Sequence, residues 1–366
     1  MASFVVNLAE VSDRDLALVG GKAGKLGELV RHGLPIPPGF VVTTEAFQGF
    51  VDATPLSTDL PAALAQLDLN RPESVDAVSR RIRDGFEGTE FPASLRATLT
   101  EAYERFVREE DARFSAVRSS ATAEDLEGAS FAGLQETYLN VHGTEAVLMA
   151  IRRCWGSLFT PRVLVYRARK GFDHSTVKLA VLVQKMVESK VSGILFTRDP
   201  NTGENHMIIE AGFGLGEPIV GGEVTPDHYV VDGATQKIIH KQVADQSFQV
   251  VRSDEGGNVK QELSAEMRTQ QKMPDDQIHR LASLGRVIES YYRRPMDIEW
   301  CADGGGLYIV QARPVTTLPS GGAPGAPPPP SRESSTGPGT PPTAPSAPAA
   351  PSSGEEPLLK GLGASP

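Results

Sequence analysis

The chain has 366 residues, with 46 acidic and 36 basic side chains and a formal net charge of −10. This length allows two or three subdomains with a sizeable core, and the acidic balance argues against a role in coating nucleic acid. The N-terminus lacks a basic segment followed by an apolar core, and no apolar run is long enough to span a bilayer. We therefore expect a cytoplasmic protein with no nucleic-acid or membrane partner.

Strand-like and helix-like stretches alternate through the first part of the chain. Residues 4–7 read as a strand, and residues 22–31 as a helix entered through two glycines. A proline-rich turn leads into a second strand over residues 40–44, where Thr44 can cap the helix that follows. Residues 115–118 form a further short strand that ends in Arg118 and opens into a run of small and hydroxylated residues.

The second part of the body has the same mixed character. Three β-rich runs, residues 177–187, 192–197 and 207–211, are each short enough to be a buried strand. Residues 275–292 carry apolar side chains at helical spacing, with two aspartates in the first turn. These patterns predict an α+β or mixed α/β body. Cys154 and Cys301 have no metal-ligand spacing, so we predict two buried thiols.

Two glycine-rich segments resemble nucleotide motifs without matching them. GGKAGKLG lacks both the first glycine of a P-loop and the Ser or Thr that follows the lysine, positions held here by Val19 and Leu26. EAGFGLGE follows a strand, but Glu217 occupies the place of the third glycine in a dinucleotide fingerprint. Neither a Walker site nor a Rossmann site is predicted.

Residues 296–315 read as a β-hairpin with a five-residue connection, residues 302–306. If Cys301 and Leu307 close the hairpin, odd-numbered residues on both arms share one face, because side chains alternate along a strand. That face carries the polar side chains Asp297, Glu299, Gln311 and Arg313, and the opposite face carries Trp300, Tyr308 and Val310.

Such a polar face suits a metal ion and a phosphate. Glu299 and Gln311 offer the hard oxygen ligands that Mg²⁺ prefers, and Arg313 offers a planar fork for a phosphoryl group. The alternative is the solvated outer face of an edge hairpin.

Six segments in order resemble one known family. They are GGKAGKLGEL, LPIPPGFVVTTEAF, AVRSSATAEDLEGASFAGLQETYLNV, SGILFTRDPNTG, AGFGLGE and DIEWCADGGGLYIVQARPVTTL. Together they resemble the nucleotide-binding domain of the phosphoenolpyruvate synthase and pyruvate phosphate dikinase family, above all that of rifampin phosphotransferases. The resemblance covers residues 1–318. It implies an ATP-grasp fold of the α+β class, with two subdomains of about residues 1–190 and 191–318 that clamp ATP and Mg²⁺.

The resemblance also implies a reaction and a set of site residues. The domain would be an ATP-dependent phosphotransferase of the dikinase type, which passes a pyrophosphoryl group from ATP to a histidine on a separate carrier domain and releases AMP. Lys22 and Arg118 would contact the phosphates, Arg313 would stabilise charge on the γ-phosphoryl group, and these three would be the catalytic residues. The remaining implied positions are Gln184 in the nucleotide cleft, Glu299 and Gln311 on Mg²⁺, and Asp297 in support of the metal. Without the resemblance, Lys22 would read as a solvated lysine.

The run after Arg118 is interpreted in the same way. Its backbone N–H groups and hydroxyls can fold over a triphosphate without blocking its approach. Gly128 and Gly133 would let this cover move, with Gly133 part of the ATP site, and Thr137 would contact the phosphates on closure. An ordinary surface loop is the alternative.

No segment of the sequence resembles the carrier-histidine motif of the family. We therefore expect the carrier-histidine and acceptor-binding domains on another polypeptide, with pyruvate, rifampin or another molecule as final acceptor. The alternatives are the ATP-binding part of a rifampin phosphotransferase-like system, a nucleotide-responsive binding module without transfer, and an orphan relative with neither role. Residues 319–366 contain 14 of the 28 prolines and no aromatic residue, which predicts a disordered tail.

Overall fold

The computed structural model describes residues 3–122, 136–172, 177–253, 256–315 and 318. Strands of the first half are β1 (Val5–Asn7), β2 (Gly39–Val42), β3 (Ser115–Ala121), β4 (Thr137–Val141) and β5 (Leu179–Lys185). Strands of the second half are β6 (Val191–Phe196), β7 (His206–Phe213), β8 (Asp227–Asp232), β9 (Ile238–Gln242), β10 (Phe248–Arg252), β11 (Asn258–Glu262), β12 (Met296–Ala302) and β13 (Leu307–Pro314).

Helices surround these strands. The α-helices are α1 (Leu16–Arg31), α2 (Thr44–Asp52), α3 (Leu56–Leu64), α4 (Pro72–Gly88), α5 (Ala93–Glu110), α6 (Thr144–Ser157), α7 (Pro161–Arg169), α8 (Glu217–Val220), α9 (Ala265–Arg268) and α10 (Asp275–Tyr292). Two 3₁₀ turns, η1 (Leu8–Glu10) and η2 (Asp13–Asp15), precede α1. Among the described residues, no helix combines the length and the apolar character needed to cross a membrane.

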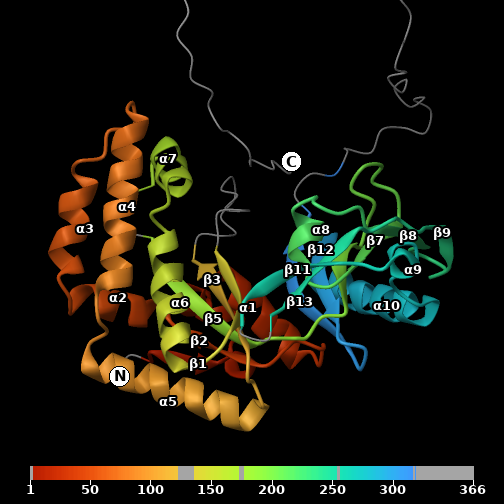
Figure 1. Cartoon of the computed structure of the whole chain (residues 1–366), viewed down its shortest axis with the longest axis horizontal. Helices are drawn as coiled ribbons and strands as arrows, with labels where there is room; N and C mark the ends of the chain where they lie inside the picture. The colour runs from red at the N-terminus through yellow and green to blue at the C-terminus, as the bar shows by residue number, and fades with distance from the viewer. Residues whose placement is uncertain (1–2, 123–135, 173–176, 254–255, 316–317, 319–366) are drawn as a thin grey trace, which may run out of the picture.

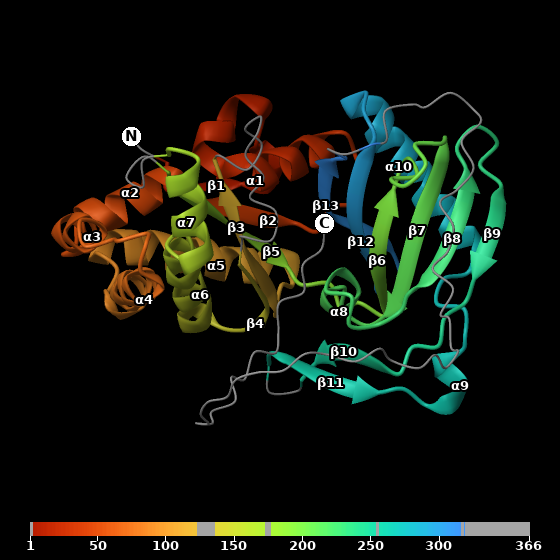
Figure 2. The ribbon, with the colours of Figure 1, turned by 90° about the horizontal axis from the view of Figure 1, so that it is seen from above.

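Two antiparallel sheets form the centre of the molecule (Figure 1). The first has five strands in the order β1-β2-β5-β3-β4, and the second has six in the order β13-β12-β6-β7-β8-β9. Helices α2 to α7 gather beside the first sheet and α10 beside the second (Figures 1 and 2). The predicted α+β class is confirmed, and the architecture agrees with the predicted ATP-grasp fold. The subdomain division near residue 190 stays a prediction, supported by the change of sheet between β5 and β6.

Each sheet has its own apolar core. Trp155, Phe50 and Phe86 belong to the first core, and Trp300 and Tyr229 to the second. The first helix joins the two halves, because Leu29 at its end and Leu34 just beyond it pack into the second core. Ile309 on β13 also donates its backbone N–H to the Pro35 carbonyl at 2.8 Å. The two sheets are therefore tied together by residues that are close to the N-terminus.

Three local predictions can be compared with the structure. Thr43, rather than Thr44, caps α2, since its hydroxyl accepts from the backbone N–H of Ala46. Thr44 is the first helical residue, and its hydroxyl donates to the Ala17 carbonyl instead. The two cysteines are free and buried, as predicted. The predicted tail, residues 319–366, lies outside the described residues.

Candidate functional site

A cavity of about 410 Å³ lies between the two large sheets. Strands β3, β4 and β5 contribute one wall, while β6, α8, β12 and β13 contribute the other. The predicted ATP-binding residues that line it are Arg118, Thr137, Gln184 and Glu299. Residues that are up to 181 positions apart, from 118 to 299, are thus brought to one site.

Much of the remaining wall is apolar. Leu139, Met186, Leu215 and Trp300 line the cavity, and the connection from β5 to β6 runs along it. An apolar space with a few convergent polar groups is typical of a small-molecule site.

Arg118 is the centre of the polar part of the cavity. It lies on β3, where every residue is buried, and only 7% of it is exposed. Its guanidinium donates to Gln311 Oε1 at 3.0 Å, to Gln184 Oε1 at 3.4 Å and to the Val310 carbonyl. Glu299 Oε2 lies 4.0 Å away. A single buried cation therefore joins the first sheet to the hairpin of the second.

Lys22 approaches the same strand from α1. The helix is broken at Gly20, whose φ of 75° and ψ of 170° form a conformation that glycine adopts readily and other residues rarely adopt. A Cβ at this position would lie 2.2 Å from the Ser120 carbonyl oxygen, so the chain passes against β3. Lys22 is 7% exposed and donates from Nζ to the Ser119 carbonyl at 3.1 Å. The interpretation of a solvated lysine is therefore wrong.

The hairpin face is confirmed, although its predicted register is wrong. Ala302, rather than Cys301, pairs with Leu307, which shortens the connection to residues 303–306. A β-bulge after Glu299 leaves Val310 without a partner and pairs Glu299 with Gln311, so that odd-numbered residues on the two arms again share one face. The predicted set Asp297, Glu299, Gln311 and Arg313 consequently shares one face. Tyr308 pairs with Cys301, and so it does not share the face of Trp300 as predicted.

Arg313 belongs to this face but does not line the cavity. Its Nε donates to Asp297 Oδ2 at 2.7 Å, and its side chain is 43% exposed against 11% for Asp297. Burial raises the pKa of Asp297 above its usual range, while the positive charge of Arg313 opposes that rise. The negative charge of Glu299 adds to the rise. The ion pair with Arg313 therefore stabilises the charged form of Asp297, which burial disfavours.

The donor set fits Mg²⁺ when phosphate completes the coordination. Among the described residues, no group of three or more Asp, Glu, His or Cys side chains could hold a metal ion by itself. Mg²⁺ typically uses one or two carboxylates together with substrate phosphates and water. Glu299 and Gln311, paired across the hairpin, supply one carboxylate and one amide oxygen.

Some site residues were missed or are not described. Gly128 and Gly133 lie outside the described residues, while Thr137 begins β4 and lines the cavity. The glycine-rich run, which is not a dinucleotide fingerprint, nevertheless reaches the cavity through Gly216 and Glu217. The position of this run directly after a strand was the feature of the sequence that could have indicated a place at the cavity.

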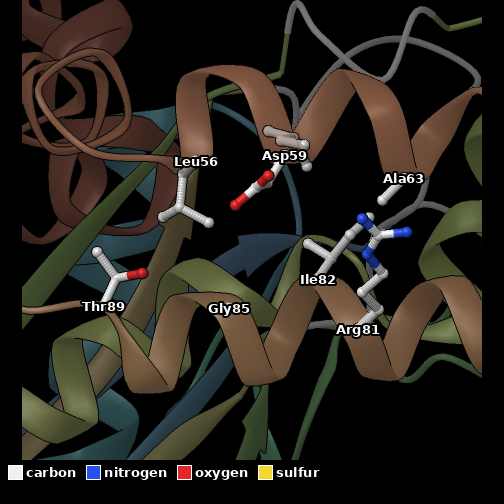
Figure 3. Close-up of a pocket in the computed structure, with 8 residues that line it drawn as sticks. Leu56, Asp59, Ala63, Arg81, Ile82, Gly85 and Thr89 are labelled. Carbon is white, nitrogen blue, oxygen red and sulfur yellow. The ribbon is translucent and has the colours of Figure 1, made fainter.

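A smaller cavity of about 150 Å³ lies between α3 and α4 (Figure 3). Its lining includes Asp59, Arg81 and Thr89 among apolar side chains. It shares no lining residue with the larger cavity. The larger cavity is the one that the predicted residues surround.

Residues 16–329 match the family described as the pyruvate phosphate dikinase AMP/ATP-binding domain. The chain belongs to this family. The resemblance found in the sequence is thereby confirmed, and the chain is an ATP-binding domain of the phosphoenolpyruvate synthase and pyruvate phosphate dikinase type.

Curated relatives of this domain include phosphoenolpyruvate synthases and rifampicin phosphotransferases. A probable phosphoenolpyruvate synthase of Archaeoglobus fulgidus is 48% identical over 315 residues, covering 86% of this chain and 42% of the relative. The phosphoenolpyruvate synthase of Pyrococcus furiosus is 41% identical over 360 residues, covering 86% and 44%. The rifampicin phosphotransferase of Bacillus subtilis is 42% identical over 320 residues, covering 87% and 36%. The chain thus spans less than half the length of these relatives.

Proposed function

We propose that this domain binds Mg-ATP in the cavity between the sheets and transfers a pyrophosphoryl group to a histidine of a carrier domain. The observation that carries the proposal is the convergence of Arg118, Gln184 and Glu299 on the wall of a largely apolar cavity, with Gln311 bonded to Arg118. Phosphoryl transfer requires mainly positioning and charge neutralisation, and these side chains supply both.

The first half of the molecule supplies two cations for the phosphates, Arg118 from β3 and Lys22 from α1. Arg118 presents a planar guanidinium, which can form two parallel hydrogen bonds to phosphate oxygens. Lys22 adds a second cation beside the same strand, held by the Ser119 carbonyl. Gln184 is fixed by its bond from Nε2 to the Pro37 carbonyl at 3.0 Å, so it forms a rigid polar edge of the cavity. Thr137, which lines the cavity, would complete the phosphate site.

The hairpin supplies the metal ligands and a third cation. Glu299 and Gln311 would hold Mg²⁺, which neutralises charge on the phosphate oxygens when bound. Arg313 would stabilise charge on the γ-phosphoryl group, and Asp297 would orient it through their ion pair. Arg118, Lys22 and Arg313 are therefore the proposed catalytic residues.

The chemical step is a displacement at phosphorus. An imidazole nitrogen of the carrier attacks the β-phosphorus with its lone pair, while the other ring nitrogen keeps its proton. The bond from the β-phosphorus to the oxygen shared with the α-phosphate breaks, and AMP leaves with that electron pair. The carrier would then pass a phosphoryl group to an acceptor such as pyruvate or rifampicin, the classes that the names of the relatives indicate.

The test uses ATP labelled at the β-phosphate, with Mg²⁺ and extract of the source cells. We expect acid-labile label on a second polypeptide together with AMP release. Arg118→Ala should abolish both, whereas Arg153→Ala, which removes a surface guanidinium bonded to Glu87, should not. Binding of Mg-ATP without label or AMP would refute transfer and favour a nucleotide-responsive binding module.

A further inference from the structure

Residues 243–274 connect β9 to α10 and form a segment outside the six-stranded sheet, which we call the excursion. Its centre is the pair of antiparallel strands β10 and β11, which we call the strap. In Figure 2 the strap runs past α8 and extends toward β4 of the first sheet. The strap therefore reaches from one wall of the nucleotide cavity to the other.

Both ends of this excursion are fixed by one buried carboxylate. Asp227 Oδ1 accepts from the backbone N–H of Ala244 at 2.9 Å, and Oδ2 accepts from that of Lys272 at 2.8 Å. Lys272 Nζ forms a fully buried ion pair with Asp227 at 2.9 Å, and the Tyr229 hydroxyl donates to Oδ2 at 2.6 Å. A buried charge that is paired and fully hydrogen-bonded holds its surroundings in one geometry. The base of the strap is thus rigid.

The strap is fastened to the first half of the molecule by Arg252. Its guanidinium pairs with Glu188 at 3.2 Å, in the connection between β5 and β6. It also lies 4.3 Å from the ring centroid of Phe114, which directly precedes β3. These contacts bring the end of β10 to the edge of the cavity.

Asn258, at the start of β11, contacts both walls. Its Oδ1 accepts from Asn140 Nδ2 at 2.7 Å, and its Nδ2 donates to Glu217 Oε2 at 3.1 Å. Asn140 is 3% exposed and follows the cavity residue Leu139 on β4. Glu217 begins α8 and lines the cavity itself. One amide thereby joins the two halves across the nucleotide site.

We propose that Asn258 is a positioning residue of the strap, which holds the Glu217 carboxylate in the cavity to accept hydrogen bonds from the ribose hydroxyls of ATP. This inference rests on the proposed nucleotide site. A carboxylate repels phosphates, which Arg118 attracts, but it accepts readily from vicinal hydroxyls. Burial raises the pKa of Glu217, the nearby Glu223 carboxylate adds to this rise, and the Asn258 amide opposes it. Asn258 therefore favours both the position and the charged form of Glu217.

The test compares ATP with 2′,3′-dideoxy-ATP in calorimetric titrations of the whole chain with Mg²⁺. Asn258→Ala is expected to weaken ATP binding by about three- to ten-fold, the range of one net hydrogen bond. It should leave binding of the dideoxy nucleotide within about two-fold of the wild type, because that probe lacks the hydroxyls. Gln261→Ala is the matched control, since Gln261 accepts from Gln249 within the strap at 2.9 Å.

A second variant keeps the contact with Asn140. Asn258→Asp retains the oxygen that accepts from Asn140 but places a carboxylate against Glu217, so its loss of ATP affinity should at least equal that of Asn258→Ala. Wild-type ATP affinity in both variants, or equal losses for the two nucleotides, would overturn the inference. The assay measures binding alone. A wild type that binds ATP and transfers nothing would refute the proposed transfer and leave the role of Asn258 intact.

Discussion

Replacing Arg313 by alanine separates the catalytic role of its charge from its structural role. The guanidinium bonds Asp297 at 2.7 Å on the hairpin face that carries the proposed metal ligands. Arg313→Ala is expected to abolish pyrophosphoryl transfer while the protein stays folded. It should also lower the free energy of unfolding by an amount that depends on pH, because Asp297 is left without its cation.

The size of this loss follows from the geometry. Two unit charges 4 Å apart attract by about 4 kcal/mol at an effective dielectric constant of 20. Breaking a buried pair costs about 3–5 kcal/mol, whereas an exposed pair contributes about 1 kcal/mol or less. Arg313 is 43% exposed and Asp297 is 11% exposed, so the pair lies between these cases. We expect a loss of about 1–2 kcal/mol once solvent screening is included.

The pH dependence has a definite sign. Burial already raises the pKa of Asp297 in the folded protein, and removing Arg313 raises it further. A carboxyl group whose folded pKa exceeds its unfolded value of about 3.9 reduces stability as pH rises through the folded pKa. The free energy of unfolding of Arg313→Ala should therefore be close to that of the wild type near pH 4, and the full loss should be reached by pH 8. Urea unfolding at both pH values measures it.

Asp297→Asn supplies the control. In the Arg313→Ala background, this second substitution removes the unpaired buried charge and should recover most of the stability at pH 8, but no transfer activity. Equal stability of wild type and Arg313→Ala at both pH values would refute the argument about the ion pair. Normal AMP release by Arg313→Ala would remove Arg313 from the proposed mechanism.

Three further changes and one control substitution test the site and the fold. Arg118→Met should weaken ATP binding by about 10- to 150-fold in calorimetry, the range of a hydrogen bond to a charged group. Glu299→Gln should raise the Mg²⁺ concentration for half-maximal ATP binding by about ten-fold in a metal titration, because one carboxylate ligand loses its charge. Gly20→Ala should lower the free energy of unfolding by about 2–4 kcal/mol in urea, from a positive φ and a contact of 2.2 Å with Ser120. Gly33→Ala, with a φ of +73° and open space around it, should lose only about 1 kcal/mol.

Periodicity in the sequence predicted the elements well wherever apolar side chains repeat. The predicted helix over residues 275–292 matches α10, and the three β-rich runs became β5, β6 and β7. The polar hairpin face was also predicted, although the pairing of Cys301 with Leu307 was wrong by one residue. The bulge at Val310 compensates for that shift. A bulge depends on the partner strand, so one strand's sequence does not reveal it.

The arrangement of the strands could not be predicted in the same way. In the first sheet, β5 lies between β2 and β3, which pairs Gln184 with Ala116 on one side and with Gly39 on the other. This order brings Gln184 within reach of Arg118. Such contacts join residues that are far apart in the sequence, and only packing against a shared core selects among the orders that local patterns allow. For the site residues, the resemblance to a known family indicated which distant segments come together.

The strap shows a further reason why part of the site was missed. All residues of β11 are exposed, so the strand has no buried side to produce an apolar alternation. Its place in the molecule is fixed by polar contacts at its base and tip, from Asp227 and Asn258. Each such contact needs two partners from separate segments, and neither partner looks unusual in its own sequence. A nucleotide site between two sheets depends on contacts of this kind, because they join segments that belong to different halves of the chain.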